Sequence, residues 1–219
     1  MDKDPRTKYA VKYYAPHTLP FVVMGLCIYL GRWTGIPANL LYPIQTALVA
    51  GCLAWFWRDW RDEVRVCADW LAVVAGIAVF AVWVLSEGFY PRMPSTGGDP
   101  FASGRGAWVY VFIAFRIFGA AVVVPLAEEL FWRSFALRFL IRSDFKSVAL
   151  GQFSWFSFIA VSLAFGFEHH RWLPGIIAGL VYAGLLYHRK NLFSPILSHA
   201  VTNLLLGIYV IATGQWTFW

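Results

Sequence analysis

Apolar runs of about 20 residues, the length that a membrane helix needs, alternate with short polar segments along most of the chain. Trp residues gather near the ends of these runs, where amphipathic rings prefer the headgroup layer. The pattern predicts an all-α, polytopic membrane protein with about seven to eight transmembrane helices. The predicted helical runs cover residues 16–33, 38–57, 69–89, 107–141, 148–167, 173–187 and 192–212.

Two features interrupt this regular pattern. Residues 91–106 are rich in Pro, Gly and Ser, and they predict the one clear loop and the best boundary inside the chain. The run 107–141 is too long for a single upright span and contains Pro125. It predicts a kinked or tilted span, or a span followed by a second helix.

Composition supports a membrane protein and excludes several other classes. The chain of 219 residues is 59% hydrophobic and only 14% charged, whereas soluble domains are roughly 45–50% apolar and about 25% charged. A soluble enzyme and a disordered chain are therefore excluded. The net charge of +6 does not indicate nucleic-acid binding, because the basic residues are scattered between apolar runs. The three cysteines show no disulfide or zinc spacing.

The distribution of basic residues predicts the orientation. If the chain crosses seven times from a cytoplasmic N-terminus, thirteen Lys and Arg fall on the cytoplasmic side and four on the other. Positively charged loops favour the cytoplasm. We expect an integral protein of a prokaryotic inner membrane with a cytoplasmic N-terminus.

A first polar group lies within the run 107–141. Glu129 and Arg133 are four residues apart and share a helix face, so they predict a salt bridge. Glu128 is rotated by about 100° from Glu129 and can point at a substrate or a water as a general acid or base. The alternative is a helix end with solvated charges.

Two further polar groups follow in the C-terminal half. Phe165 and His169 are four residues apart at the end of the fifth run, and His170 falls outside this spacing. His199 and Asn203, also four apart, lie within the seventh run. This pair can stabilise an oxyanion or hold helices together by hydrogen bonds, whereas His169 can simply lie in an interfacial loop.

Together, the groups EExxxR, FxxxH and HxxxN on three helices resemble the type II CAAX prenyl endopeptidase and bacteriocin-processing family, also called CPBP or ABI, of glutamate intramembrane proteases. The resemblance covers roughly residues 122–206. The whole chain, 1–219, is predicted to be one membrane domain. Within it, the spans of residues 1–90 carry no motif, and residues 107–213 form the protease-like core with a polar intramembrane cavity.

The resemblance implies a hydrolase, an intramembrane endopeptidase that cleaves a membrane-associated protein or peptide, possibly lipidated. Glu128 and His169 would activate the attacking water, and His199 and Asn203 would stabilise the oxyanion. Glu129 and Arg133 would support Glu128. No cofactor is expected. A metal-independent mechanism is preferred, because no HExxH motif offers a two-His zinc face.

Two other functions remain open. A non-catalytic membrane scaffold or regulator of the same fold would keep the polar core without cleaving anything. A small transporter or proton relay ranks last, because transporters often contain internal repeats and none is found in this sequence.

The predicted topology raises one conflict. If the fifth run crosses the membrane, His169 lies toward the far side while Glu128 lies near the cytoplasm. The two can meet only if Glu128 lies deep in the bilayer, or if the turn after residue 167 enters a water-filled cavity.

Overall fold

The computed structural model describes residues 5–94, 99–101 and 106–218, with side chains from residue 12 onward. The described elements are all helical. The α-helices are α1 (Pro5–Thr34), α2 (Ala38–Trp55), α3 (Trp57–Trp60), α4 (Trp70–Leu85), α5 (Ala107–Phe118), α6 (Val124–Glu129), α7 (Leu137–Phe139), α8 (Trp155–Phe167), α9 (Trp172–Arg189) and α10 (Phe193–Thr213). The shorter elements are η1 (Arg61–Glu63), η4 (Phe145–Ser147) and η5 (Trp216–Phe218), which are 3₁₀ turns, and η2 (Gly119–Val123) and η3 (Leu130–Ala136), which are π-helical.

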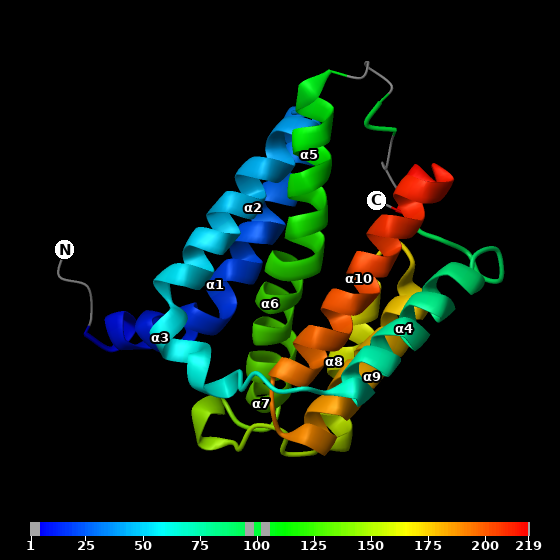
Figure 1. Cartoon of the computed structure of the whole chain (residues 1–219). Coiled ribbons are helices and arrows are strands. Elements are labelled where there is room, and N and C mark those ends of the chain that lie inside the picture. Colours follow the sequence, from blue (N-terminus) through cyan, green and yellow to red (C-terminus); the bar gives the residue numbers. More distant parts are fainter. Residues whose placement is uncertain (1–4, 95–98, 102–105, 219) are drawn as a thin grey trace.

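The helices are arranged around one long central helix. Figure 1 shows α5, α6 and α7 as a continuous green rod, with α1 and α2 on one side and α4, α8, α9 and α10 on the other. The π-helical segments η2 and η3 join the three parts without a break. The predicted run 107–141 therefore folds as one continuous helix, Ala107–Phe139, with two π-helical segments.

Each of the seven predicted runs contains a helix or the larger part of one. The largest differences are at two helix starts. Helix α1 begins at Pro5, eleven residues before the predicted residue 16. Helix α8 begins at Trp155 and not at residue 148, because the chain turns at Gly151, whose φ of 76° is left-handed. Of the predicted loop 91–106, residues 95–98 and 102–105 lie outside the described residues. So do Lys3 and Arg105, and the side chains of Arg6 and Lys8, which enter the predicted orientation.

Among the described residues, four helices are long and apolar enough to span a membrane: Lys12–Thr34, Ala38–Trp55, Ala107–Phe139 and Phe193–Thr213. Helices α4 and α8 are apolar but shorter, at 16 and 13 residues. The total of seven to eight transmembrane helices thus stays a prediction.

The Asp69 side chain connects the ends of three helices, α4, α9 and α10. Its side chain accepts a hydrogen bond from the Ala72 N–H and so caps α4. Arg189 at the end of α9 donates to both Asp69 oxygens, at 3.1 and 2.9 Å, and the Ser194 hydroxyl in α10 donates to Oδ2 at 2.7 Å. The positions of α4, α9 and α10 are therefore coupled at this end.

Helices α8 and α9 approach closely at Gly166. A Cβ atom there would lie 2.2 Å from Ile176 Cγ1 and 2.6 Å from Ile176 N. We therefore expect Gly166→Ala to separate the helices and to destabilise the protein by roughly 1–3 kcal/mol. The measurement is the midpoint of thermal unfolding in detergent. Gly184→Ala in α9 is the control, because nothing lies within 4 Å of its added Cβ. Equal midpoints for the two variants would contradict this packing.

A polar cluster holds α1 and the segment η1 against the C-terminal end of the long helix. Arg138 donates to Glu63 Oε1 at 2.7 Å, the Ser134 hydroxyl donates to Oε2, and His17 Nε2 lies 3.5 Å from Oε1. Burial alone would raise the Glu63 pKa. The neighbouring His17 and the Arg138 guanidinium outweigh burial and lower this pKa to about 2.

This lowered pKa makes the stability of the protein sensitive to acid. The ordinary pKa of 4.5 applies to the unfolded chain, so ionised Glu63 stabilises the fold above that pH by about 3 kcal/mol. That contribution is lost as the pH falls from 4.5 towards 2. We expect Glu63→Gln to lower the unfolding midpoint near neutral pH and to flatten its decline in acid. Asp62 is exposed, so Asp62→Asn should leave the fall of the midpoint in acid unchanged. If the midpoint of Glu63→Gln fell in acid as steeply as that of the wild type, Glu63 would not be the group responsible.

Candidate active site

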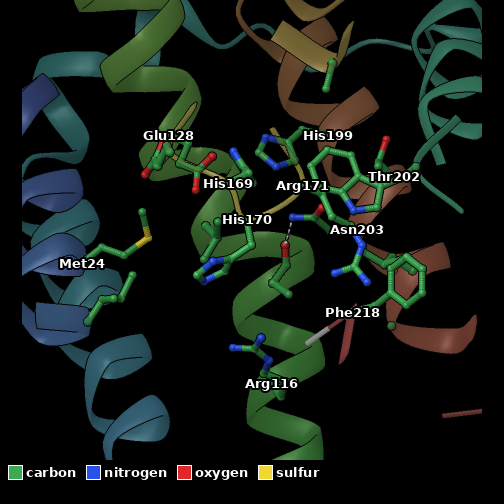
Figure 2. A pocket seen from close by; sticks show the side chains of 18 of the residues that line it. Met24, Arg116, Glu128, His169, His170, Arg171, His199, Thr202, Asn203 and Phe218 are labelled. Carbon is green, nitrogen blue, oxygen red and sulfur yellow. Dashed lines mark hydrogen bonds between the residues drawn. The ribbon is translucent and has the colours of Figure 1, made fainter. Parts of the chain in front are cut away.

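One cavity of about 360 Å³ lies between the long helix and the helices on both of its sides. All four predicted catalytic residues, Glu128, His169, His199 and Asn203, line it, and Figure 2 shows them around the same space. They come from α6, from the turn after α8, and from α10. The structure thus brings together the residues that the sequence grouped, while their catalytic roles stay a prediction.

The short length of α8 resolves the conflict over depth. Its 13 residues extend about 20 Å, less than the roughly 30 Å of a hydrocarbon core. Glu128 lies well inside the helix Ala107–Phe139, eleven residues before its end. The Trp132 indole N–H donates to Glu168 Oε2 at 3.1 Å and ties the end of α8 to the long helix. The turn that carries His169 therefore reaches the level of Glu128.

Glu128 presents a carboxylate to the cavity from a buried position. Its residue is 5% exposed, and Oε2 has no hydrogen-bond partner among the described residues. Glu129 on the next residue is fully buried and does not line the cavity. The 100° rotation between neighbours thus separates the two carboxylates as predicted.

Glu129 connects Arg133 and His199. Its Oε2 lies 3.0 Å from Arg133 Nε, and its Oε1 lies 2.9 Å from His199 Nδ1. The predicted salt bridge between Glu129 and Arg133 is confirmed, and the second contact adds to the prediction. Because the carboxylate accepts, His199 Nδ1 carries a proton, and Nε2 is left for the cavity. Glu129 therefore contacts His199. Among the described residues, no hydrogen bond joins Glu129 to Glu128.

Aromatic rings hold the Arg133 and His199 side chains in place. The guanidinium carbon of Arg133 lies 4.1 Å from the centre of the Phe165 ring, a favourable cation–π contact. The Tyr182 ring stacks on His199 at 5.0 Å between centroids, and its hydroxyl donates to Thr202 at 2.9 Å. Phe165 of the FxxxH motif thus packs against the guanidinium that pairs with Glu129.

His169 is fixed in one tautomer. The Phe165 carbonyl lies 2.8 Å from Nδ1, and a carbonyl can only accept, so Nδ1 carries the proton. Nε2 is then an acceptor when the ring is neutral. Trp83 packs edge-on against the ring at 5.4 Å. His170, which falls outside the spacing of the FxxxH motif, also lines the cavity, and its Nε2 lies 3.2 Å from the Arg32 guanidinium.

Asn203 completes a hydrogen bond that Pro125 cannot make. In the π-helical segment η2 the Val124 N–H donates to the Gly119 carbonyl, so the next carbonyl, of Ala120, would need the N–H of Pro125, which proline lacks. Asn203 Nδ2 donates to this carbonyl at 2.9 Å, the dashed line in Figure 2. The amide has a second N–H, which stays available for a ligand.

Sequence reasoning missed four residues at this site: Trp83, Trp132, Glu168 and Tyr182. Glu168 stands directly before His169 in the sequence but was not among the predicted site residues. The others are aromatic residues within apolar runs, where packing is the common role. Among the described residues, no group of three or more His, Cys, Asp and Glu side chains is placed to hold a metal ion.

Comparison with known proteins supports the motif-based prediction. No curated protein and no solved structure matches the chain. A family model does match, over nearly the same region as the predicted resemblance. Residues 108–205 match the family described as type II CAAX prenyl endopeptidase, Rce1-like, so the resemblance that the motifs predicted is confirmed for this part of the chain.

Proposed function

We propose that this integral membrane protein is an intramembrane endopeptidase that hydrolyses a peptide bond of a membrane-associated protein or peptide. One observation carries the proposal: α6, the turn after α8 and α10, which are far apart in the sequence, bring Glu128, His169, His199 and Asn203 to one cavity. The family match over residues 108–205 supports the same reaction class.

Glu128 and His169 activate the water in this proposal. Glu128 lines the cavity, and its Oε2 has no hydrogen-bond partner among the described residues. It takes a proton from the water as the water attacks the scissile carbonyl. His169 orients that water, because its Nδ1 is held by the Phe165 carbonyl and its Nε2 accepts. No metal is required for this step.

His199 and Asn203 stabilise the oxyanion that forms. For Nε2 of His199 to donate, the ring must carry a proton on both nitrogens. Glu129, held in turn by Arg133, contacts Nδ1 and favours that charged ring. The second Asn203 N–H supplies another donor. Glu129 and Arg133 thus act on the oxyanion side of the reaction.

The proposed substrate class and orientation are based on the membrane helices that surround the cavity and on the distribution of basic residues. A cavity between membrane helices selects a protein or peptide that is itself membrane-associated, possibly through a lipid. The excess of basic residues on one side favours a cytoplasmic N-terminus, in the inner membrane of a prokaryote.

Comparative proteomics of membranes tests the proposal. Cells with the wild type and cells with Glu128→Ala are compared for a membrane peptide that stays uncleaved only in the variant. A cleavage site lost in Glu128→Ala, and kept when wild-type membranes are treated with a metal chelator, is the expected result. Identical peptides from both strains would contradict the endopeptidase and favour a scaffold, and loss with chelator would contradict the metal-independent step.

A further inference from the structure

A polar side chain of α2 lines the cavity but takes no part in the reaction described so far. Gln45 lies seven residues after the start of α2 and is 6% exposed. It belongs to the N-terminal part of the chain, outside the family match over residues 108–205. Polar residues within membrane helices are costly and commonly face a bundle interior or a water-filled cavity, where they serve a function.

The Gln45 amide is uncommitted. Among the described residues its side chain has no hydrogen-bond partner, although it is buried and lines the cavity. Other polar side chains of the cavity are already engaged, because Thr202 donates to the Gly76 carbonyl and Arg171 donates to Glu87. A buried amide without a partner costs free energy. Gln45 therefore offers a donor and an acceptor to whatever occupies the cavity.

The packing of α2 on the long helix fixes the level of Gln45. A Cβ atom at Gly119 would lie 2.7 Å from the Tyr42 hydroxyl oxygen and 2.8 Å from Thr46 Oγ1, so the missing side chain lets α2 approach. Tyr42 and Thr46 flank Gln45 in the sequence. Asn203 in α10 donates to the next carbonyl along the long helix. Gln45 and Asn203 thus approach the same turn from helices on opposite sides of the rod (Figure 1).

A peptide bound in this cavity brings backbone groups that need partners. Each N–H and C=O group that leaves water must find a hydrogen bond inside the protein. The Gln45 side chain carries an N–H donor and a C=O acceptor side by side, which is the complement that one residue of an extended backbone presents. A hydrocarbon chain has neither group and would leave the amide unpaired. The side chain therefore favours peptide, and not a lipid tail, at this place in the cavity.

We propose that Gln45 is a substrate-binding residue of the endopeptidase, and that its amide pairs with the backbone N–H and C=O of one substrate residue. This inference rests on the function proposed above. Gln45 lies at the level of Ala120, which precedes Glu128 by eight residues, about 12 Å along a helix. An extended peptide rises about 3.3 Å per residue. The substrate residue that Gln45 binds is therefore within about four residues of the scissile bond.

Ester scanning of the substrate tests the inference. The peptide spans the bond found by the proteomic comparison, and each analogue replaces one backbone N–H near that bond by an ester oxygen, while the scissile amide is kept. Wild type and Gln45→Leu in liposomes are compared on every analogue. At one position the ester should lower kcat/KM of the wild type by about ten- to hundredfold, mainly through KM. Gln45→Leu should lose as much on the unmodified peptide, and that same ester should lower its kcat/KM by less than about threefold more.

Stability and a matched variant separate binding from packing. The unfolding midpoint of Gln45→Leu should not fall, because an apolar side chain replaces a buried amide that has no partner among the described residues. Asn39→Leu is the control in the same helix. Asn39 Oδ1 also has no partner among the described residues, but Asn39 is not a cavity residue, so kcat/KM should stay unchanged.

The outcomes separate this inference from the function on which it rests. An unchanged kcat/KM in Gln45→Leu would overturn the inference and leave the endopeptidase intact. Ester effects that are equal in the two proteins at every position would do the same, and a lower midpoint beside them would assign Gln45 to packing. If the wild type does not cleave the unmodified peptide, the proposed function fails and the inference fails with it.

Discussion

Glu128→Gln is expected to lower kcat for peptide hydrolysis by about 10³–10⁴, at the upper end of what a general base contributes. Glutamine keeps the size of the side chain but cannot take a proton from water. The buried Oε2 has no partner among the described residues, so the substitution breaks no identified hydrogen bond of that atom. The measurement is single-turnover cleavage by the purified protein in liposomes, with substrate in the same bilayer.

The control for this variant is its own stability. Because replacement by Gln removes a buried charge, the unfolding midpoint should not fall, so lost activity cannot be assigned to unfolding. A folded Glu128→Gln protein that retains a tenth or more of the wild-type rate, a loss of about tenfold or less, would contradict a base at this position.

Glu129→Ala is expected to have the largest effect on stability. Glu129 and Arg133 are both fully buried, 3.0 Å apart, and removal of one partner leaves an uncompensated buried charge. Such a loss costs about 3–5 kcal/mol. The variant also removes the partner of His199 Nδ1. Chemical unfolding in detergent, followed by circular dichroism, measures the difference from wild type.

A double variant separates the charge from the packing. Glu129→Leu with Arg133→Met removes both charges and keeps the volume filled, so it should recover part of the stability lost in Glu129→Ala. It should remain inactive, because His199 has lost the carboxylate that supports its charged form. A Glu129→Ala protein within about 1 kcal/mol of wild type would show that the pair is not the buried contact described here.

The sequence predicted the helices well where apolar runs are bounded by polar segments or turn residues. Ala38 and Ala107 were predicted as helix starts and begin α2 and α5. The start of α8 was predicted seven residues too early, because residues 148–150 are apolar although Gly151 turns the chain. The π-helical segments were not predicted. Hydrophobic periodicity does not reveal them, and the partner of the Ala120 carbonyl is on another helix.

The site was predictable to the extent that its residues repeat at helical spacing. The Glu129–Arg133 salt bridge is local, four residues apart, and spacing alone indicated it. The contact between Glu129 and His199 joins residues 70 positions apart, and the cluster around Glu63 joins α1 to the long helix. Such contacts depend on how the helices pack against one another. The spacing of residues along one sequence does not reveal that packing. The family resemblance supplied the grouping, and the structure supplied the contacts.

Oxygen labelling tests the central claim, hydrolysis by water activated at Glu128, most directly. Wild-type protein in liposomes cleaves the peptide once in H₂¹⁸O, and mass spectrometry reads both the new carboxyl terminus and the peptide of the protein that contains Glu128. The expected result is one ¹⁸O in the product and none in Glu128. A product that carries only ¹⁶O, with the ¹⁸O found in Glu128, would show that Glu128 attacks as a nucleophile, and the absence of any product would contradict the endopeptidase.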